Sequence, residues 1–476
     1  MRLQLEILTK EERVQIHGEA LRILEEVGAR YPSEEALALL AGGGAVVDWD
    51  TQVARLPRGL VESALALCPR EVRFGARDPA WDFALPSGMP LYNLDGCGVF
   101  TYDYGTGLRR SAVLRDVSDA ARVFDSLAMG WLAWPPVSPG DVPIAPRSIV
   151  STATVMKNCS KHVMDEVKTR AEVPYAMALS GILAGGTEQA RERPMYSATY
   201  CTVSPLCHDP AMMEATMDLS AYYAPILVYP TPASGTTGPA SLYGNVALAV
   251  AEALSCVALF QLRSPGCPLV MGAAMGSVDG RTGAFLYGAP ETALQLAAVA
   301  EMCAFYGMPS FVAGCTADAK MPGIQSAIEK MVTSLPAVLA GAGMLNGFGL
   351  LECGMTLSLE QMVIDGEIAL LNERLRRGID LAPEKNLFDD VQAVGPGGHF
   401  LKRKSTRALF RSDEFQEAPL LDRGGYAEWR ADGGRELTDK AHARVRDVLA
   451  AEQRLPMDTE TARLLDEVVA EAKAKL

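Results

Sequence analysis

The sequence predicts an α/β protein whose centre is a closed TIM-type (β/α)8 barrel with a smaller extension at each end. From about residue 128, apolar strand-like runs alternate with long helical stretches rich in Ala and Leu. Apolar strands in repeated strand–helix units are typical of a parallel sheet covered by helices. Eight such units over roughly 270 residues match the usual size of a barrel. A doubly wound open sheet is the alternative, but no GxGxxG follows any of these strands.

The N-terminal extension, residues 1–127, is expected to pack on the barrel. It opens with the capping-box pattern TKEE, in which Thr9 is the N-cap and Glu12 follows three residues later, and Gly28 ends the helix. Residues 46–112 then contain short apolar runs separated by Gly and Pro, which indicate a β-rich section with hairpins.

The barrel is expected to span residues 128–400. Its predicted strands are 130–137, 162–167, 195–203, 224–230, 268–274, 309–315, 342–349 and 389–395. Helical stretches fall between them, for example 173–184, 211–222, 242–263, 290–306, 324–341 and 358–377. The stretch within 242–263 is apolar but contains Glu252, so a buried helix explains it better than a membrane span.

The C-terminal extension, residues 401–476, is polar and helical. Its stretch LTDKAHARVRDVLAAEQ predicts a charged amphipathic helix. We expect this extension to cap the barrel or to form contacts in a homo-oligomer.

Composition and charge exclude several classes of partner. The formal net charge of −14 argues against nucleic acid and against an anionic membrane surface, and is compatible with a cationic ligand. Ten scattered cysteines form no CxxC pair, and the N-terminus lacks a signal peptide. These features predict a cytoplasmic protein with free thiols.

The predicted carboxyl ends of the barrel strands, where barrel enzymes hold their active sites, combine aromatic rings with carboxylates. Such a combination in an acidic protein suits a quaternary ammonium ion, although each ring taken singly is compatible with ordinary packing. The candidates for the cation are Tyr102, Tyr104, Tyr200, Tyr229 and Phe348, with Glu166 or Glu352 to balance its charge. In the loop TPASGTTGPAS, Thr236, Thr237 and Gly238 are candidates for binding a carboxylate through backbone N–H groups.

Other chemistries lack their motifs. The histidines form no HExxH pair, and the spacing of Cys201, Cys207 and His208 matches no standard zinc pattern, so we expect no metal site. There is no GxSxG nucleophile elbow and no GxxxxGK[ST] phosphate loop.

Several segments together resemble the trimethylamine methyltransferase family over most of the chain. They are SPL (204–206), SGTTGPASLYGNVALAVAEALS, QLRSPGCPLVMG, GAPETALQLAAVAEMCAFYGMP, CTADAK, SLEQMVIDGEI (358–368) and GHFLKRKSTRALFRSDEF. The resemblance implies a TIM barrel that moves a methyl group from an amine to the Co(I) of a separate corrinoid protein. The chain has no DxHxxG cobalamin signature, so the corrinoid is expected to belong to this partner and no cofactor to the chain itself.

The resemblance also bears on the substrate. Some members of the family use pyrrolysine to act on trimethylamine, and that position falls close to Met321, just after TADAK. Members without pyrrolysine are expected to demethylate quaternary amines such as glycine betaine, proline betaine or carnitine-like compounds. A quaternary nitrogen leaves as a neutral amine and needs only positioning and removal from water.

These observations predict a methyltransferase that acts on a small cationic methylamine, with glycine betaine as the first candidate. Asp318 and Met321, in the loop GCTADAKMPG, are the candidate catalytic residues: Asp318 would pair with Lys320 to shape the loop, and Met321 would occupy the pyrrolysine position. A structural loop, with Asp318 capping the next helix, is the plainer alternative. A catalytically silent betaine-binding or regulatory protein and a methyltransferase that uses thiols or a metal also stay open.

Overall fold

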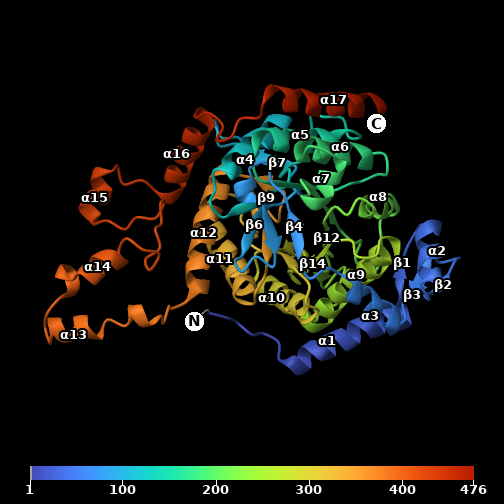
Figure 1. The fold of residues 1–476 in the computed structure, drawn as a ribbon, viewed down its shortest axis with the longest axis horizontal. Helices are drawn as coiled ribbons and strands as arrows, with labels where there is room; N and C mark the ends of the chain where they lie inside the picture. The colour runs from blue at the N-terminus through green and yellow to red at the C-terminus, as the bar shows by residue number, and fades with distance from the viewer. Residues whose placement is uncertain (1–2) are drawn as a thin grey trace.

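The computed structural model describes residues 3–476 and contains, within them, a closed barrel of eight parallel strands (Figure 1). The strands neighbour one another in the order β10, β11, β12, β14, β17, β18, β6 and β9. Their bounds are β6 Leu91–Leu94, β9 Gly130–Ala133, β10 His162–Asp165, β11 Tyr196–Tyr200, β12 Ile226–Val228, β14 Leu269–Ala273, β17 Ser310–Ala313 and β18 Met344–Phe348. The predicted (β/α)8 barrel is confirmed.

A covering helix follows each barrel strand, and together these helices surround the barrel (Figure 1). In chain order they are α4 Leu114–Asp125, α5 Arg147–Asn158, α6 Val173–Ala184, α8 Pro210–Ser220, α9 Leu242–Arg263, α10 Pro290–Phe305, α11 Ile324–Leu339 and α12 Leu359–Arg377. The short α7, Thr187–Glu192, lies between α6 and β11. Among the described helices, α9 alone is long and apolar enough to cross a membrane, and 94% of its most apolar window is buried inside the protein.

One predicted strand was wrong. Residues 389–395 are largely helical, as α13 Phe388–Val394, and the eighth strand is β6, which pairs in parallel with β18 and β9. Two acidic residues in the first turn favour the helix, because Asp389 and Asp390 lie at the positive end of its dipole. The barrel therefore begins before residue 128 and its last helix ends at Arg377, so the predicted limits of 128 and 400 are both corrected.

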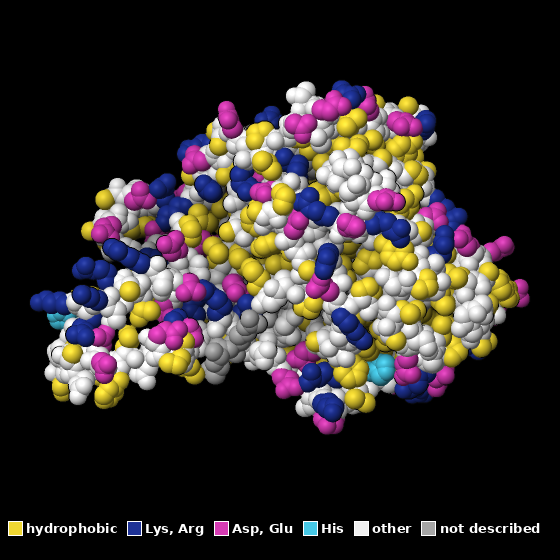
Figure 2. Space-filling view, viewed as in Figure 1, with side chains coloured by type: hydrophobic (Ala, Val, Ile, Leu, Met, Phe, Trp, Pro, Cys, Tyr) yellow, Lys and Arg dark blue, Asp and Glu magenta, His cyan; other side chains and the backbone are white. Residues whose placement is uncertain are grey.

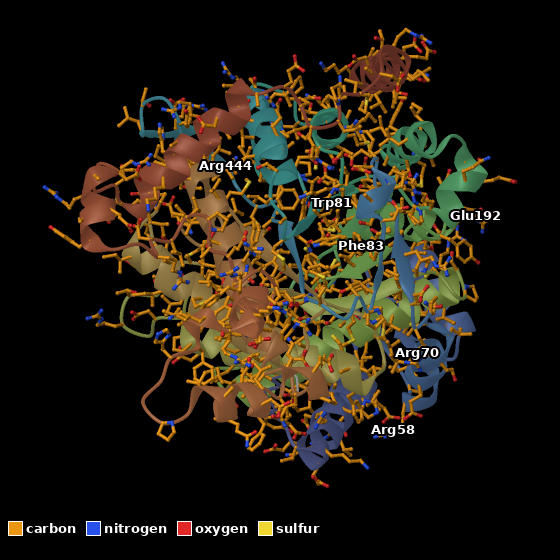
Figure 3. The ribbon with its side chains drawn as sticks, turned by 60° about the vertical axis from the view of Figure 1, so that its left-hand side comes forward. Arg58, Arg70, Trp81, Phe83, Glu192 and Arg444 are labelled. Atoms are coloured by element: carbon orange, nitrogen blue, oxygen red, sulfur yellow. The ribbon has the colours of Figure 1, made fainter. Side chains whose placement is uncertain are left out.

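The N-terminal extension packs beside and beneath the barrel. It contains α1 Lys10–Arg22, the π-helix η1 Ile23–Val27, α2 Glu34–Gly42, α3 Arg58–Leu67, the 3-10 turn η2 Pro79–Trp81, and strands β1 Ala29–Arg30, β2 Val46–Asp48, β3 Val53–Arg55, β4 Val72–Phe74 and β5 Phe83–Leu85. The predicted capping box is present, with Thr9 and Glu12 exchanging hydrogen bonds. Trp81 and Phe83, labelled in Figure 3, pack edge-on against Trp131 of β9 and so join the extension to a barrel strand.

The C-terminal region is helical, as predicted. Its helices are α13, α14 Lys404–Leu409, α15 Tyr426–Ala431, α16 Leu437–Ala450 and α17 Thr459–Lys475, with the 3-10 turns η3 Pro383–Lys385 and η4 Phe400–Lys402. Helix α16 packs on α12 and α4, and α17 packs on α5 and α6. The segment 378–436, which we call the arm, projects to the left of the barrel in Figure 1 and includes α13, α14 and α15.

Loops at the carboxyl ends of the barrel strands add two small sheets. One contains β13 Ala233–Ser234, β15 Gly276–Val278 and β16 Phe285–Leu286. The other contains β7 Phe100–Tyr102, β8 Arg109–Ser111, β19 Leu350–Leu351 and β20 Thr356–Leu357. These sheets stand beside the opening formed by the carboxyl ends of the eight strands, which we call the mouth.

A fully buried ion pair holds the ends of β17 and β18 in place. Lys330 of α11 and Asp365 of α12 pair at 2.8 Å, and both side chains have no exposed surface. The Lys330 ammonium also donates to the carbonyls of Cys315 and Gly347, at 2.8 and 2.9 Å. The carboxylate accepts from the backbone N–H of Gly349 at 2.7 Å. Two helices and two strand ends therefore meet at one pair of charges.

Replacing Lys330 by Met is expected to lower the free energy of unfolding by about 3–5 kcal/mol, because the substitution leaves the Asp365 carboxyl buried without its partner. Chemical denaturation of the variant measures the loss. The exposed Lys402→Met is the matched control and should change stability by less than about 0.5 kcal/mol. A Lys330→Met protein as stable as the control would show that the pair does not hold the strand ends.

Candidate functional site

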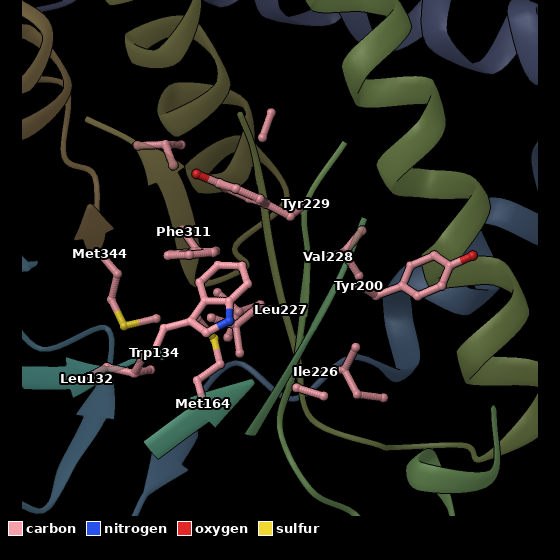
Figure 4. Packing of buried hydrophobic residues seen from close by; sticks show 14 of the residues in the cluster. Leu132, Trp134, Met164, Tyr200, Ile226, Leu227, Val228, Tyr229, Phe311 and Met344 are labelled. Carbon is pink, nitrogen blue, oxygen red and sulfur yellow. The ribbon is translucent and has the colours of Figure 1, made fainter. Parts of the chain in front are cut away.

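Alternate residues of the barrel strands face its interior, and these side chains determine what lies beneath the mouth. In β12 the sequence alternates, so that Leu227 and Tyr229 point inward with Trp134 and Phe311, while Ile226 and Val228 point outward (Figure 4). The Tyr229 ring stacks on Phe311 with 4.5 Å between centroids. The upper part of the interior is therefore lined by aromatic rings.

Two carboxyls, Asp95 and Glu166, lie close together at the mouth. Asp95 follows β6 and is 2% exposed, whereas the Glu166 side chain, which follows β10, is 26% exposed. Burial raises the pKa of both carboxyls, and the charge of Asp95 raises the pKa of Glu166 further. Glu166 pairs with the exposed Lys168 at 3.7 Å, and a cation between the two carboxyls would add compensating charge where burial disfavours their ionised forms.

Two thiols lie beside these carboxyls. Cys97 donates to Asp95 Oδ1 at 2.8 Å, and Cys201 lies 3.9 Å from Glu166 Oε1. The Cys97 side chain is exposed to solvent, yet burial raises the pKa of its thiol well above the usual range. The Cys97 thiol and the Glu166 side chain are both reached by solvent, so the acidic pair borders an accessible part of the mouth.

The indole of Trp134 is held rigidly at the mouth. Its Nε1 donates to Asp165 at 3.2 Å, and the same carboxylate accepts from Thr152 and Ser148 at 2.8 and 3.0 Å. Gly96 lies against the ring so closely that an added Cβ would be 2.3 Å from it. A glycine is required here by the close approach, and Trp134 presents a fixed aromatic face.

Tyr229 and Tyr287 complete the aromatic wall. The Tyr229 hydroxyl donates to Asn346 Oδ1 at 2.6 Å, and Tyr287 lies in the loop between β16 and α10. Burial raises the pKa of both phenols well above the usual range, and the Asp95 charge adds to this effect. Both rings are therefore neutral and lie near the acidic pair.

The loop GCTADAKMPG follows β17 and is bound tightly to its neighbours. The Asp318 carboxylate accepts from the backbone N–H groups of Tyr287 and Gly288, at 2.5 and 3.0 Å. Lys320 Nζ donates to the backbone carbonyl of Asp318 at 2.6 Å, so the predicted contact between these residues runs through the main chain. Asp318 thus positions the loop that carries Tyr287. Met321 is 65% exposed at the outer end of the loop.

Two of the predicted cation-binding rings face away from the interior. Tyr200 is fully buried; its hydroxyl bonds His208 Nδ1 at 2.7 Å and its ring packs edge-on against Phe260 of α9 (Figure 4). Phe348 stacks on Tyr92, whose hydroxyl bonds Asn372 of α12. Both rings belong to the layer between the strands and the helices, so the structure places neither at the mouth.

The other predicted residues lie around the mouth. Tyr102 donates through its hydroxyl to the carbonyl of Lys320, and the ring of Tyr104 stacks on His442 of α16 with 4.5 Å between centroids. Glu352 pairs with Arg109 at 2.9 Å and accepts from Thr356 at 2.6 Å. Its charge is therefore already balanced.

The turn containing Thr236, Thr237 and Gly238 uses most of its donors internally. The N–H groups of Thr236 and Gly238 both donate to the carbonyl of Ala233, at 3.1 and 3.0 Å. The Thr237 hydroxyl accepts from the N–H of Ala233 at 2.9 Å. Only the N–H of Thr237 is left among these three, so the turn is a poor carboxylate site.

The predicted residues that do meet at the mouth are Glu166 and Tyr229. Those that the sequence analysis missed are Asp95, Cys97, Trp134 and Tyr287, together with the interior asparagines Asn93 and Asn346. A signal for Asp95 was present in LYNLDG, where polar residues alternate with apolar ones, but that segment was assigned to a hairpin.

Residues 3–476 contain no cluster of three or more His, Cys, Asp or Glu side chains that could hold a metal ion. His208 uses both ring nitrogens, on Tyr200 and on Ser255, and burial lowers its pKa to about 3. The possible site formed by Cys201, Cys207 and His208 is therefore not supported.

The family model described as trimethylamine methyltransferase matches residues 2–476. Trimethylamine methyltransferase MttB of Methanosarcina thermophila is 33% identical over 465 residues, covering 96% of this chain and 95% of the relative. Glycine betaine methyltransferase of Desulfitobacterium hafniense strain Y51 is 32% identical over 451 residues, covering 93% and 92%.

A solved structure with a similar outline is the monomethylamine methyltransferase of Methanosarcina barkeri. It is 12% identical, with a TM-score of 0.44, covering 98% of this chain and 93% of that one.

The exposure of Cys97 at the mouth predicts its selective labelling. A small thiol reagent should modify Cys97 before the buried cysteines, and the rate should rise about tenfold per pH unit between pH 7 and 9, because the raised pKa keeps the thiolate scarce. Mass spectrometry of the intact protein measures the rate. Cys97→Ser should lose the fast phase. A wild-type rate no faster than that of the variant would mean that the mouth is closed.

Proposed function

The chain belongs to the trimethylamine methyltransferase family, and from this premise we propose that it transfers a methyl group from a small quaternary amine to the Co(I) of a separate corrinoid protein. Glycine betaine is the first candidate substrate. The proposal also includes a cytoplasmic location, as expected from the free cysteines.

The observation that carries this proposal is the group of carboxyls and aromatic rings at the mouth. Asp95 and Glu166 provide negative charge, and Trp134 and Tyr229 provide neutral aromatic faces inside the barrel. A quaternary ammonium has no N–H to donate, so it is held by charge and by ring faces rather than by directed hydrogen bonds. This combination favours a permanently charged amine, which keeps its charge at every pH, whereas trimethylamine is a cation only while protonated.

Two further observations support a quaternary substrate. Position 321 is an ordinary methionine, so the chain lacks the special electrophile that the family resemblance places near it. A relative over nearly the full length of the chain bears the name glycine betaine methyltransferase.

The corrinoid, when its protein is bound, supplies the cobalt nucleophile that accepts the methyl group. The residues of this chain hold the cation, turn one methyl outward and keep water away from the reacting carbon. Binding a cation favours the ionised forms of Asp95 and Glu166, whose pKa values burial raises. We therefore expect proton release on binding at any pH where these carboxyls are partly protonated, and tighter binding as the pH rises.

The loops around the mouth suit a docked protein. Large apolar side chains are exposed there although nothing in the described chain covers them: Val99, Leu108, Met321, Ile324 and Met355, of which Ile324 is 84% exposed. Exposed apolar residues around an active-site opening are typical of an interaction surface. We propose this rim as the docking surface for the corrinoid protein.

Calorimetric titration with glycine betaine, proline betaine, carnitine and trimethylamine is the first test. We expect one quaternary amine to bind and trimethylamine not to bind. The protein should then methylate a Co(I) corrinoid protein with that amine, which visible absorption follows directly. Binding without transfer would identify a silent binding protein, and binding of trimethylamine alone would overturn the proposed substrate class.

Replacing Glu166 by Gln should weaken binding of the quaternary amine about tenfold, or about 1.4 kcal/mol, because it removes one of the two charges facing the cation. Glu352→Gln is the matched control, since the Glu352 carboxylate pairs with Arg109 at 2.9 Å, closer than the 3.7 Å between Glu166 and Lys168. Equal effects of the two substitutions would argue for a general change of charge rather than a cation site between Asp95 and Glu166.

We also propose that the chain forms a homo-oligomer through its arm. The arm exposes the apolar residues Leu381, Phe388, Val391, Leu401 and Phe410 on short helices, and the stretch 391–412 has five Lys or Arg and no acid in a protein of net charge −14 (Figure 2). Helices of six or seven residues need packing partners to be stable. Light scattering should show an oligomer, and Phe388→Asp together with Leu401→Asp should dissociate it. An unchanged mass would exclude the arm as the interface.

A further inference from the structure

Two asparagines inside the barrel have amide groups without partners. Among the described residues, neither Nδ2 nor Oδ1 of Asn93 has a hydrogen-bond partner, and Nδ2 of Asn346 has none. Both side chains are 0% exposed. A buried polar group without a partner costs about 1–3 kcal/mol, and native proteins keep few of them. Three such atoms at one place indicate that water or a ligand binds there.

The two amides lie side by side on the interior face. Asn93 of β6 and Asn346 of β18 are directly paired in the parallel register, and paired residues of parallel strands point to the same side of the sheet. Asn346 follows Met344 by two residues, and Met344 lies inside the barrel with Trp134 (Figure 4). Both amides therefore face the barrel axis.

Tyr229 determines which end of the Asn346 amide is free. Its hydroxyl donates to Asn346 Oδ1 at 2.6 Å, so the oxygen of the amide is occupied and the NH2 group remains available. Asn93 can present its own NH2 group beside it. The site thus offers neutral N–H donors, which bind an anionic or carbonyl oxygen.

The amides lie deeper than the acidic pair. Asp95 follows Asn93 by two residues, just beyond the end of β6, and two extended residues advance the chain by roughly 6.6 Å toward the mouth. A ligand in the barrel therefore meets donors at its inner end and carboxylates at its outer end. That arrangement matches a small zwitterion with its negative group inward and its cation outward.

We propose that Asn93 and Asn346 bind the carboxylate of the substrate, which makes the substrate a carboxylate-bearing quaternary amine and directs its methyl groups toward the mouth. This inference rests on the proposed function. It assigns the carboxylate to the barrel interior instead of the turn at Thr236–Gly238, whose donors are largely used within the turn. A quaternary amine without a carboxylate would bind only through its cation and would lack the contacts with Asn93 and Asn346.

The test compares glycine betaine with tetramethylammonium, which has the same cation and no carboxylate, by calorimetry on the wild type and on Asn93→Leu. The variant should bind glycine betaine at least tenfold more weakly and tetramethylammonium within twofold of the wild type. Equal losses for both ligands, or no loss for either, would overturn the proposal. Asn346→Leu is the second variant, in case the first does not fold.

Acetate separates failure of this inference from failure of the proposed function. The line width of 13C-labelled acetate in NMR should increase with the wild type and not with Asn93→Leu, whether or not any quaternary amine binds. Absence of broadening by the wild type would overturn the carboxylate site while leaving a cation site intact. If acetate binds but neither ammonium compound does, the proposed function fails and the anion site remains.

Thermal unfolding of the ligand-free variants gives a further check. Because the Asn93 amide has no partner in the free chain, Asn93→Leu should keep or raise the unfolding midpoint. A lowered midpoint would mean that the amide is permanently bonded to structural water, and would overturn its assignment to a ligand.

Discussion

The buried pair of Lys330 and Asp365 is the interaction on which the geometry of the mouth depends. Its two charges bind main-chain groups at the ends of neighbouring strands, through Cys315, Gly347 and Gly349. These ends are not regular: Cys315 has a φ of 62°, and Gly347 has a φ of 120° and approaches the carbonyl of Gly314 so closely that a Cβ would be 2.7 Å from it. Charge-assisted hydrogen bonds in a dry interior can hold such conformations, which weaker contacts would not.

The irregularity at Gly347 decides which side chains enter the barrel. The pairing between β18 and β6 shifts between Asn346 and Phe348. In an unbroken strand these two residues would share a face. The shift instead leaves Asn346 inside, next to Asn93, and turns Phe348 outward onto Tyr92. The irregularity at Gly347 therefore leaves the Asn346 amide inside the barrel and keeps the Phe348 ring out of it.

Most of the fold could be predicted from the sequence because buried parallel strands form continuous apolar runs between helices. The exception, β6, has four residues and is separated from its helix α4 by the hairpin of β7 and β8, so the strand–helix alternation does not reveal it. The site was harder to predict, since strands buried on both faces give no compositional sign of which residues point inward. Tyr200 illustrates this. Neighbouring residues of a strand point to opposite faces, and the Tyr200 ring lies on the face that packs on α9 instead of the face inside the barrel. Asp95 was missed because its strand was missed.

The closing seam of the barrel also makes binding and folding interdependent. Residues 91–94 join residues 344–348, so the ring of strands stays open until nearly three quarters of the chain has been synthesised. Such distant contacts form late and slowly. Asn93 and Asn346 lie on the two sides of this seam. In a nascent chain the two amides therefore come together only when the barrel closes. A ligand that binds both amides would connect β6 to β18, and its presence in the cell would stabilise the closed barrel relative to the open one.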